Sequence, residues 1–317
     1  MDFSPQSNLL LLSSWDSTVR LYNTDANRRL ETFNFPGAML SCSLRDDDSG
    51  FACGLDCSVH MLNSVKGTSQ PMGSHTAPAS CLDWCPQTSL LYSGSWDSTV
   101  AAWDARSATG APATTLALPG RVYSLSVAPS AYTLVVATAD RHVLVYDTRS
   151  LAAPVQTRES PLRHQTRKVA CFPNGCGFAI GSVEGRVGVE YLCPQSAEGL
   201  SAGLSSYAFK CHRRGDVAYP VNAIAFHPVF GTFATGGGDG TVNVWDGDNK
   251  KKLCQLHQYP TSIASLAFSR DGSMLAIASS YTFEEGEKQS PPDDNVVLRR
   301  MDEVDVKPRP KQVPPAN

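Results

Sequence analysis

Short apolar stretches with alternating polar positions recur along the chain, and most are followed by a second apolar stretch and a tight acidic turn. One such unit reads VNAIAF, then GTFATGG, then Asp239-Gly240, then VNVWD. An apolar period of two predicts strands with one buried face. An Asp–Gly turn suits a short hairpin because Gly tolerates a positive φ. The pattern therefore predicts an all-β protein made of repeated antiparallel units.

The acidic turns recur at a nearly constant spacing, with intervals of 40, 41, 43, 44 and 55 residues. The turn acids are Asp16, Asp56, Asp97, Asp140, Glu184 and Asp239. The last interval contains an insertion near residues 193–218. A seventh unit, 262–281, lacks the acidic turn and is followed by the insertion TFEEGEKQSPPDDN and a strand at 296–298. A period of about 40 to 45 residues with four strands per unit predicts a seven-bladed WD40 β-propeller.

We expect one propeller domain over residues 1–301, followed by a Pro-rich, disordered tail over 302–317. The expected blades lie near residues 3–35, 37–70, 75–118, 120–157, 164–212, 219–257 and 259–301. The first unit begins at DFSP, which matches only the end of a blade's first strand. Such propellers usually close with an N-terminal strand that joins the last blade. We therefore expect N-terminal closure that is incomplete or uses other residues, and an unpaired edge would favour aggregation.

Composition and charge narrow the function classes. The net charge of −3 argues against a general nucleic-acid binder. The ten cysteines form no C-x-x-C pair, so the common zinc and redox spacings are absent, and we expect buried free thiols in a reducing compartment. No apolar run is long enough to span a membrane, and no leader is visible. We expect a nuclear or cytosolic protein without a cofactor.

Two motifs resemble catalytic sites but fit the repeat better. The GGGDG run at 236–240 lies at the hairpin position and lacks the spacing of a phosphate-binding loop. The residue types of a catalytic triad occur among His75, Ser93, Asp97 and Trp103. In WD40 repeats this foursome forms a structural hydrogen-bond network, and we expect His164 to play the same part in its blade. An enzyme would need a convergent acid–base or metal cluster, which we do not find, so we expect no catalysis.

Two tryptophans stand immediately before turn acids. Trp15 and Trp96 occupy the position where other units have smaller residues, among them Leu55 and Gly238. This position lies at a strand end near the propeller surface. The rings either pack against neighbouring loops or form a pair of aromatic anchors on one face, since aromatic residues dominate binding hot spots.

Basic residues gather around the fifth unit. They are Arg163, His164, Arg167, Lys168, Arg186, Lys210, His212, Arg213 and Arg214. They are either solvated charges or, if they converge, an acceptor for carboxylates or a phosphorylated side chain, which Arg binds through its planar fork.

Several long segments are similar to one family. ESPLRHQTR, EGRVGVEYL, FKCHRR, YPVNAIAFHP, FATGGGDGTVNVWD and YPTSIASLAFS together resemble the spindle-assembly-checkpoint WD40 proteins of the budding-uninhibited-by-benzimidazoles type, over about residues 3–300. The related nuclear-pore mRNA-export WD40 factors share the ESPL and EGRV segments. VEYL and YPTSIASLAFS favour the checkpoint family.

The resemblance implies a non-enzymatic, peptide-binding adaptor. GLEBS-type segments of a checkpoint kinase and its kinase-like relative would lie across the top face, flanked by Trp15 and Trp96. The resemblance also implies membership of the checkpoint complex that inhibits a ubiquitin ligase, and a place in the nucleus, at mitotic kinetochores and in the cytoplasm. The alternatives are the mRNA-export factor, which binds a nucleoporin segment, and a generic WD40 scaffold without affinity for such peptides.

The resemblance also implies a phosphopeptide site. Phosphorylated MELT-type motifs of an outer-kinetochore scaffold would bind Arg186 and either Lys210 or Arg213, with Arg167 added from the QTR segment. A phosphate with a charge near −2 is well matched by convergent guanidinium groups. Direct binding of nucleic acid or membrane is not expected.

Overall fold

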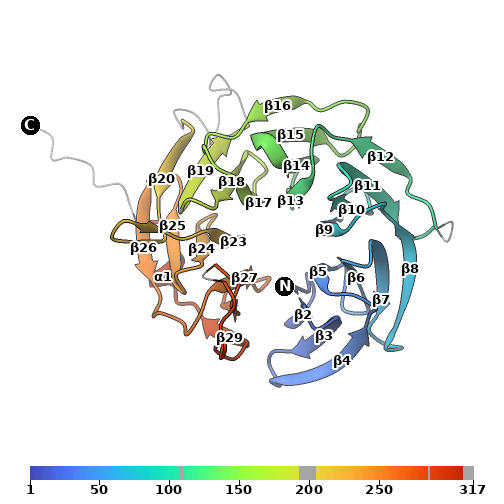
Figure 1. Ribbon diagram of the computed structural model, residues 1–317, viewed down its shortest axis with the longest axis horizontal. Helices are drawn as coiled ribbons and strands as arrows, with labels where there is room; N and C mark the ends of the chain where they lie inside the picture. Colours follow the sequence, from blue (N-terminus) through green and yellow to red (C-terminus); the bar gives the residue numbers. More distant parts are fainter. Residues whose placement is uncertain (108–109, 193–204, 285, 310–317) are drawn as a thin grey trace, which may run out of the picture.

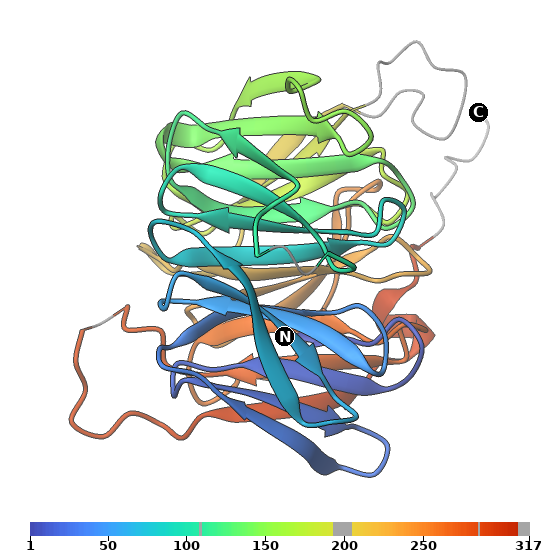
Figure 2. The ribbon, with the colours of Figure 1, turned by 90° about the vertical axis from the view of Figure 1, so that its right-hand side faces the viewer.

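Seven antiparallel sheets surround a central channel in the computed structural model, which describes residues 1–107, 110–192, 205–284 and 286–309 (Figure 1). Six sheets have four strands, and the seventh has three in the described part of the chain. Seen from the side, the sheets form a thick disc (Figure 2). The structure therefore confirms the all-β, seven-bladed WD40 propeller.

The first four blades run in chain order around the ring. Their strands are β1 (Asp2–Phe3), β2 (Leu9–Ser13), β3 (Thr18–Asn23), β4 (Arg28–Asn34), β5 (Met39–Leu44), β6 (Ser49–Gly54), β7 (Ser58–Asn63), β8 (Thr68–Ser74), β9 (Ala79–Cys85), β10 (Leu90–Ser95), β11 (Thr99–Asp104), β12 (Thr114–Ala117), β13 (Val122–Val127), β14 (Thr133–Thr138), β15 (His142–Asp147) and β16 (Gln156–Glu159). A 3-10 turn, Ala139–Arg141, joins β14 to β15.

The remaining three blades complete the ring. Their strands are β17 (Thr166–Cys171), β18 (Gly177–Ser182), β19 (Arg186–Tyr191), β20 (Tyr207–Lys210), β23 (Val221–Phe226), β24 (Phe233–Gly237), β25 (Val242–Asp246), β26 (Lys251–Gln255), β27 (Ile263–Phe268), β28 (Met274–Ser279) and β29 (Asn295–Arg300). A small hairpin, β21 (Arg213–Arg214) and β22 (Val217–Ala218), lies between the fifth and sixth blades.

The core lies between neighbouring sheets, so the second strand of a blade is buried on both faces. All six residues of β6 and of β18 are buried. Glycine lets the sheets approach closely at equivalent positions. A Cβ at Gly94 would lie 2.4 Å from Val122, and one at Gly236 would lie 2.4 Å from Ile263, each in the first strand of the next blade.

Hydrogen bonds between inner strands tie several blades together. The backbone N–H of Val127 donates to the Asp83 carboxylate at 2.8 Å, and that of Leu82 donates to Ser41 Oγ at 3.2 Å. In each case a polar side chain of one inner strand accepts a bond from the inner strand of the next blade. These bonds satisfy backbone groups that face the channel and have no strand partner there.

The blade seam between the first and last sheets is the least complete. β1 contains only two residues, as expected from the DFSP start. The Met1 ammonium lies 3.4 Å from Ser265 Oγ in β27. The outer edge of the seventh sheet is β29, where Val296 and Val297 are 41% and 36% exposed. Among the described residues, the seventh sheet therefore ends at a partly exposed edge strand, β29.

The expected disordered tail is wrong for residues 302–309. A one-turn helix, α1 (Glu303–Val306), packs on the sixth blade. Val306 is buried with Met301 in the cluster between the sixth and seventh blades, and Thr232 Oγ1 donates to its carbonyl at 2.7 Å. A single apolar residue, Val306, in a short acidic segment is a weak sequence signal, whereas the Pro-rich composition predicts disorder. Residues 310–317 lie outside the described residues.

Three features of the described part of the chain concern membranes, metals and cysteines. No helix there is long and apolar enough to cross a membrane. No group of three or more His, Cys, Asp or Glu there is placed to hold a metal ion. The described cysteines are free and most are buried. Cys193 lies outside the described residues.

Candidate peptide-binding face

The turns between the second and third strands share one face of the disc with the loops that connect blades, because successive strands alternate in direction. We call this side the turn face. Contacts between the two kinds of connection support this placement. The backbone N–H of Trp96 donates to the Pro78 carbonyl in the loop that enters the third blade. The insertion between β28 and β29 belongs to this face and projects from it (Figure 2, orange loop at the left).

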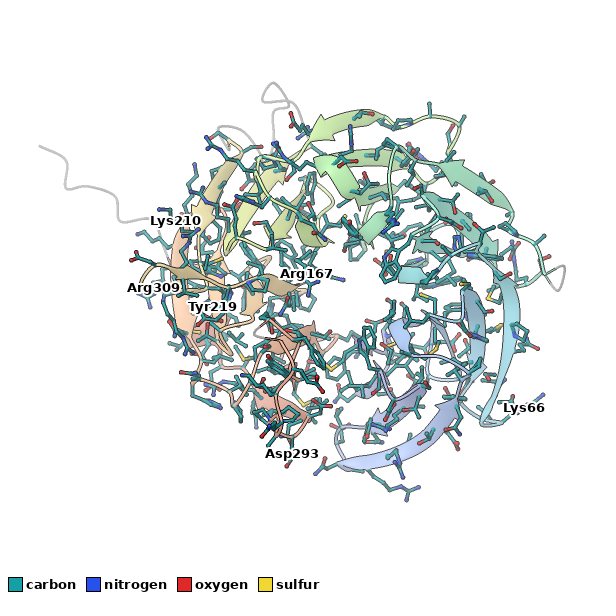
Figure 3. All side chains as sticks on the ribbon, in the orientation of Figure 1. Lys66, Arg167, Lys210, Tyr219, Asp293 and Arg309 are labelled. Atoms are coloured by element: carbon teal, nitrogen blue, oxygen red, sulfur yellow. The ribbon has the colours of Figure 1, made fainter. Side chains whose placement is uncertain are left out.

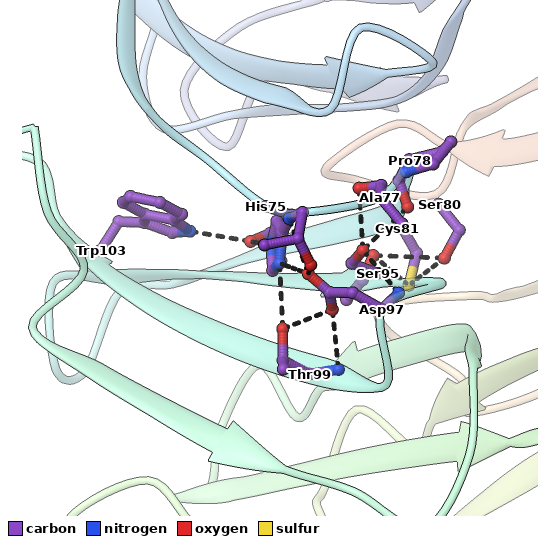
Figure 4. A network of polar contacts seen from close by, with 12 residues as sticks. His75, Ala77, Pro78, Ser80, Cys81, Ser95, Asp97, Thr99 and Trp103 are labelled. Carbon is purple, nitrogen blue, oxygen red and sulfur yellow. Dashed lines mark hydrogen bonds and ion pairs between the residues drawn. The ribbon is translucent and has the colours of Figure 1, made fainter.

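His75 and Trp103 lie close together in the third blade (Figure 4), and Ser93 joins them in a buried network. Ser93 Oγ lies 2.7 Å from both Trp103 Nε1 and His75 Nε2. His75 Nδ1 lies 3.3 Å from the Asp97 carboxylate. Burial lowers the pKa of His75, which keeps the ring neutral. The foursome is therefore a structural network, as expected.

The expectation for His164 is wrong, and His212 takes that role instead. His212 Nδ1 lies 2.9 Å from Asp239 and its Nε2 lies 2.8 Å from Thr235 Oγ1, which also accepts a bond from Trp245 Nε1 at 2.9 Å. This network belongs to the sixth blade. It removes the buried His212 from the set of surface cations.

The fifth blade cannot build such a network. Strand register places Ile180 where the third blade has Ser93, and Glu190 where it has Trp103. A hydroxyl acceptor and an indole donor are therefore both missing. The His164 side chain is 60% exposed. These substitutions were visible in the sequence, and they were the signal against a structural role for His164.

The two turn tryptophans lie on the turn face of the first and third blades. Trp15 is 73% exposed and lines the mouth of the central channel beside Asp16 and Arg20. Trp96 is half-buried. A large ring left this exposed has much apolar area still to bury, which favours an anchor role over packing for Trp15. Trp96 is thus more buried than Trp15.

Three of the basic residues surround Glu184 in the turn between β18 and β19. His164 Nε2 and Arg186 Nε each lie 3.7 Å from its Oε2 atom. The Arg213 guanidinium donates to its backbone carbonyl at 2.8 Å. We call His164, Arg186, Lys210 and Arg213 the cation cluster.

Lys210 joins the cluster through the sheet. It pairs directly with Arg186 across β19 and β20, so the two side chains project on the same side. Like charges at directly opposed positions destabilise a strand pair. Lys210 and Arg213 are exposed, and Arg186 is half-buried. The arrangement therefore suits an anion that would offset the repulsion.

Arg167 is not part of the cluster. Its guanidinium donates to Asn222 Oδ1 at 3.1 and 3.3 Å, at the rim of the channel. Figure 3 shows Arg167 beside the channel and Lys210 near the outer edge of the ring. Arg214 also turns away, because it donates to the Asp239 carbonyl and lies over the Tyr219 ring. The basic residues thus divide between a channel rim and an outer cluster, which sequence spacing did not separate.

The fold, the two networks and the turn face define a WD40-repeat propeller. A family model described as WD domain, G-beta repeat matches residues 1–23, 68–104 and 204–246. The second segment contains the network of the third blade, and the third segment contains the network of the sixth blade.

Full-length relatives identify the family. The chain is 49% identical to "Mitotic checkpoint protein BUB3.1" of Arabidopsis thaliana over 98% of this chain and 92% of that protein. It is 41% identical to "Mitotic checkpoint protein bub3" of Dictyostelium discoideum over 97% and 93%. A "Poly(A)+ RNA export protein" of Schizosaccharomyces pombe is 35% identical over 98% and 89%. The chain belongs to the BUB3 family of mitotic checkpoint WD40 proteins.

Proposed function

We propose that this protein is a non-enzymatic adaptor that binds a GLEBS-type segment of a checkpoint kinase, or of its kinase-like relative, across the turn face. The observation that carries the proposal is the 73% exposure of Trp15 at the channel mouth. Trp96 lies on the same face, two blades further along the chain. A peptide lying across the second blade would cover both rings.

We further propose that the cation cluster binds a phosphorylated threonine of MELT-type motifs in an outer-kinetochore scaffold. Arg186, Lys210 and Arg213 supply the positive charge, and the direct opposition of Arg186 and Lys210 supports an anionic ligand. Arg167, at the channel rim, would contact the bound peptide away from its phosphate. Recruitment to kinetochores in the nucleus, and assembly into the checkpoint complex that inhibits a ubiquitin ligase, would follow from these contacts.

Calorimetric titration with a GLEBS-type peptide from the checkpoint kinase tests the first proposal. We expect submicromolar binding, and we expect Trp15→Ala and Trp96→Ala each to weaken it by about 2 kcal/mol. Val65→Ala is the matched control, because Val65 is equally exposed at 73% but lies between β7 and β8 on the opposite face. A folded protein that does not bind the peptide would refute the adaptor proposal.

Phosphopeptide binding tests the second site separately. Arg186→Glu should abolish binding of a phosphothreonine MELT-type peptide and leave the GLEBS-type titration unchanged. Arg106→Glu is the control, since Arg106 is exposed beside Asp104 on the opposite face. Equal loss of both peptides in Arg186→Glu would show that the sites are not independent.

The mRNA-export function is the second candidate, and the 35% identical relative gives it its support. Localisation separates the two functions. The checkpoint proposal expects kinetochores in prometaphase, whereas the export function expects the nuclear rim in interphase and binding to a nucleoporin segment.

A further inference from the structure

The turn acid of the fifth blade differs in its hydrogen bonding from four of the other turn acids. In four other blades, the turn aspartate accepts a bond from the backbone N–H two residues later, at 2.9–3.1 Å. The aspartates are Asp16, Asp56, Asp97 and Asp239. The described structure contains no such bond for Glu184. The extra methylene of glutamate carries its carboxylate away from the turn and towards the cation cluster.

The Glu184 carboxylate is held only loosely in that cluster. Its Oε2 atom lies 3.7 Å from His164 and from Arg186, beyond hydrogen-bond range. Its Oε1 atom is buried without a hydrogen-bond partner among the described residues. The side chain is only 18% exposed, so water compensates little of its charge. Charge attraction, and not directional bonding, keeps it in place.

We infer that Glu184 is an internal counter-ion that occupies the cation cluster in the free protein and competes with an incoming phosphate. The inference rests on the proposed phosphopeptide site and adds its regulation. With no ligand bound, the carboxylate offsets the repulsion between Arg186 and the other cations. A phosphate with a charge near −2 and three acceptor oxygens is the stronger partner for the same donors. Binding therefore includes the cost of releasing Glu184, which keeps the phosphopeptide exchangeable.

Glu184→Gln is the direct test, because it removes the charge and keeps the shape. Glu190→Gln is the matched control. Glu190 lies in β19, the strand that follows Glu184, and forms an ion pair with Arg158, which keeps its bonds to Gln156 and to the Tyr191 carbonyl. Both variants change the net charge equally. Fluorescence anisotropy with the phosphothreonine peptide should show binding about fivefold tighter for Glu184→Gln and unchanged for Glu190→Gln. Unchanged or weaker binding to Glu184→Gln would overturn the inference and make Glu184 a residue that positions Arg186.

A second measurement does not depend on the peptide. At low ionic strength, Glu184→Gln should unfold at a lower temperature than the wild type, because the cations lose their counter-ion. Inorganic phosphate at millimolar concentration should raise its Tm more than it raises the Tm of the wild type or Glu190→Gln. If the wild type fails to bind the phosphopeptide, the proposed site is wrong, and this Tm comparison still decides the role of Glu184. Equal phosphate responses in all three proteins would refute it.

Discussion

The Asp83 carboxylate is the polar group whose charge should most affect stability. Burial raises its pKa from 3.8 to about 7; the bond from the Val127 amide lowers it, and repulsion from Asp2 raises it further. A rise of this size corresponds to about 4 kcal/mol of free energy between the folded and unfolded states. Asp83 is half-buried and lines a water-accessible channel of about 1550 Å³, so water screens part of this cost. We expect a net penalty of about 1–2 kcal/mol for the ionised form.

The direction of the pH effect follows from the raised pKa. The unfolded chain ionises Asp83 from about pH 4, while the folded protein holds the proton until about pH 7. The contribution of Asp83 to the free energy of unfolding therefore falls as pH rises through this range and is constant above it. Asp83→Asn removes the ionisation and keeps an oxygen that can accept the Val127 N–H. The variant should be more stable than the wild type by about 1–2 kcal/mol at pH 8, and by less at pH 5.

Urea unfolding of both proteins between pH 5 and pH 8 measures this difference. Histidines and other carboxylates titrate in both proteins, so their contributions cancel when the two curves are subtracted. Asp83→Ala is the control for the hydrogen bond, since it leaves the Val127 N–H unpaired and should be less stable than Asp83→Asn by about 1–3 kcal/mol. A stability difference between wild type and Asp83→Asn that does not change with pH would refute the reasoning.

The structural networks give two further predictions. Ser93→Ala should lower the free energy of unfolding by about 2 kcal/mol, because it removes the hydroxyl that accepts a bond from Trp103 and also bonds to His75 inside the third blade. Chemical denaturation checks this, and a loss below about 0.5 kcal/mol would contradict it. His212→Ala should cost about 2–3 kcal/mol, whereas His164→Ala, at an exposed site, should change stability by less than about 0.5 kcal/mol. Equal effects of the two histidine variants in the same assay would show that the networks do not stabilise the blades.

The repeat made the fold predictable, because each blade repeats the same short strands and tight turns. The surface position of Trp15 was also predictable, because this residue stands immediately before the turn acid Asp16. The tail was not, since one buried residue, Val306, decides whether residues 302–309 pack. A prediction from composition averages over the whole segment and does not detect one buried residue such as Val306. Packing of that residue against the sixth blade orders the segment despite its prolines.

The division of the basic residues was beyond the sequence for a different reason. Spacing along the chain shows that Arg167 and Arg186 belong to the same blade, but not which residues each side chain contacts. Arg167 is in the inner strand β17, whereas Arg186 begins the third strand, β19. Radial position depends on strand order within a blade, which can be read from the repeat. Contacts such as that between Arg167 and Asn222 in the next blade depend on side-chain geometry and cannot.

The fifth blade differs from the third and sixth blades in the surroundings of its turn acid. The third and sixth blades each use a histidine, a hydroxyl and an indole to fix the turn, and their turn aspartates are committed to that network. The fifth blade has Ile180 and Glu190 at the hydroxyl and indole positions, so its turn acid has no structural network to join. His164 is exposed instead, and the mostly buried Glu184 carboxylate lies near His164 and Arg186, while Arg213 donates to the Glu184 backbone carbonyl. The cations around Glu184 thus lie beside a turn acid that no structural network holds, and this arrangement supports the proposed anion site.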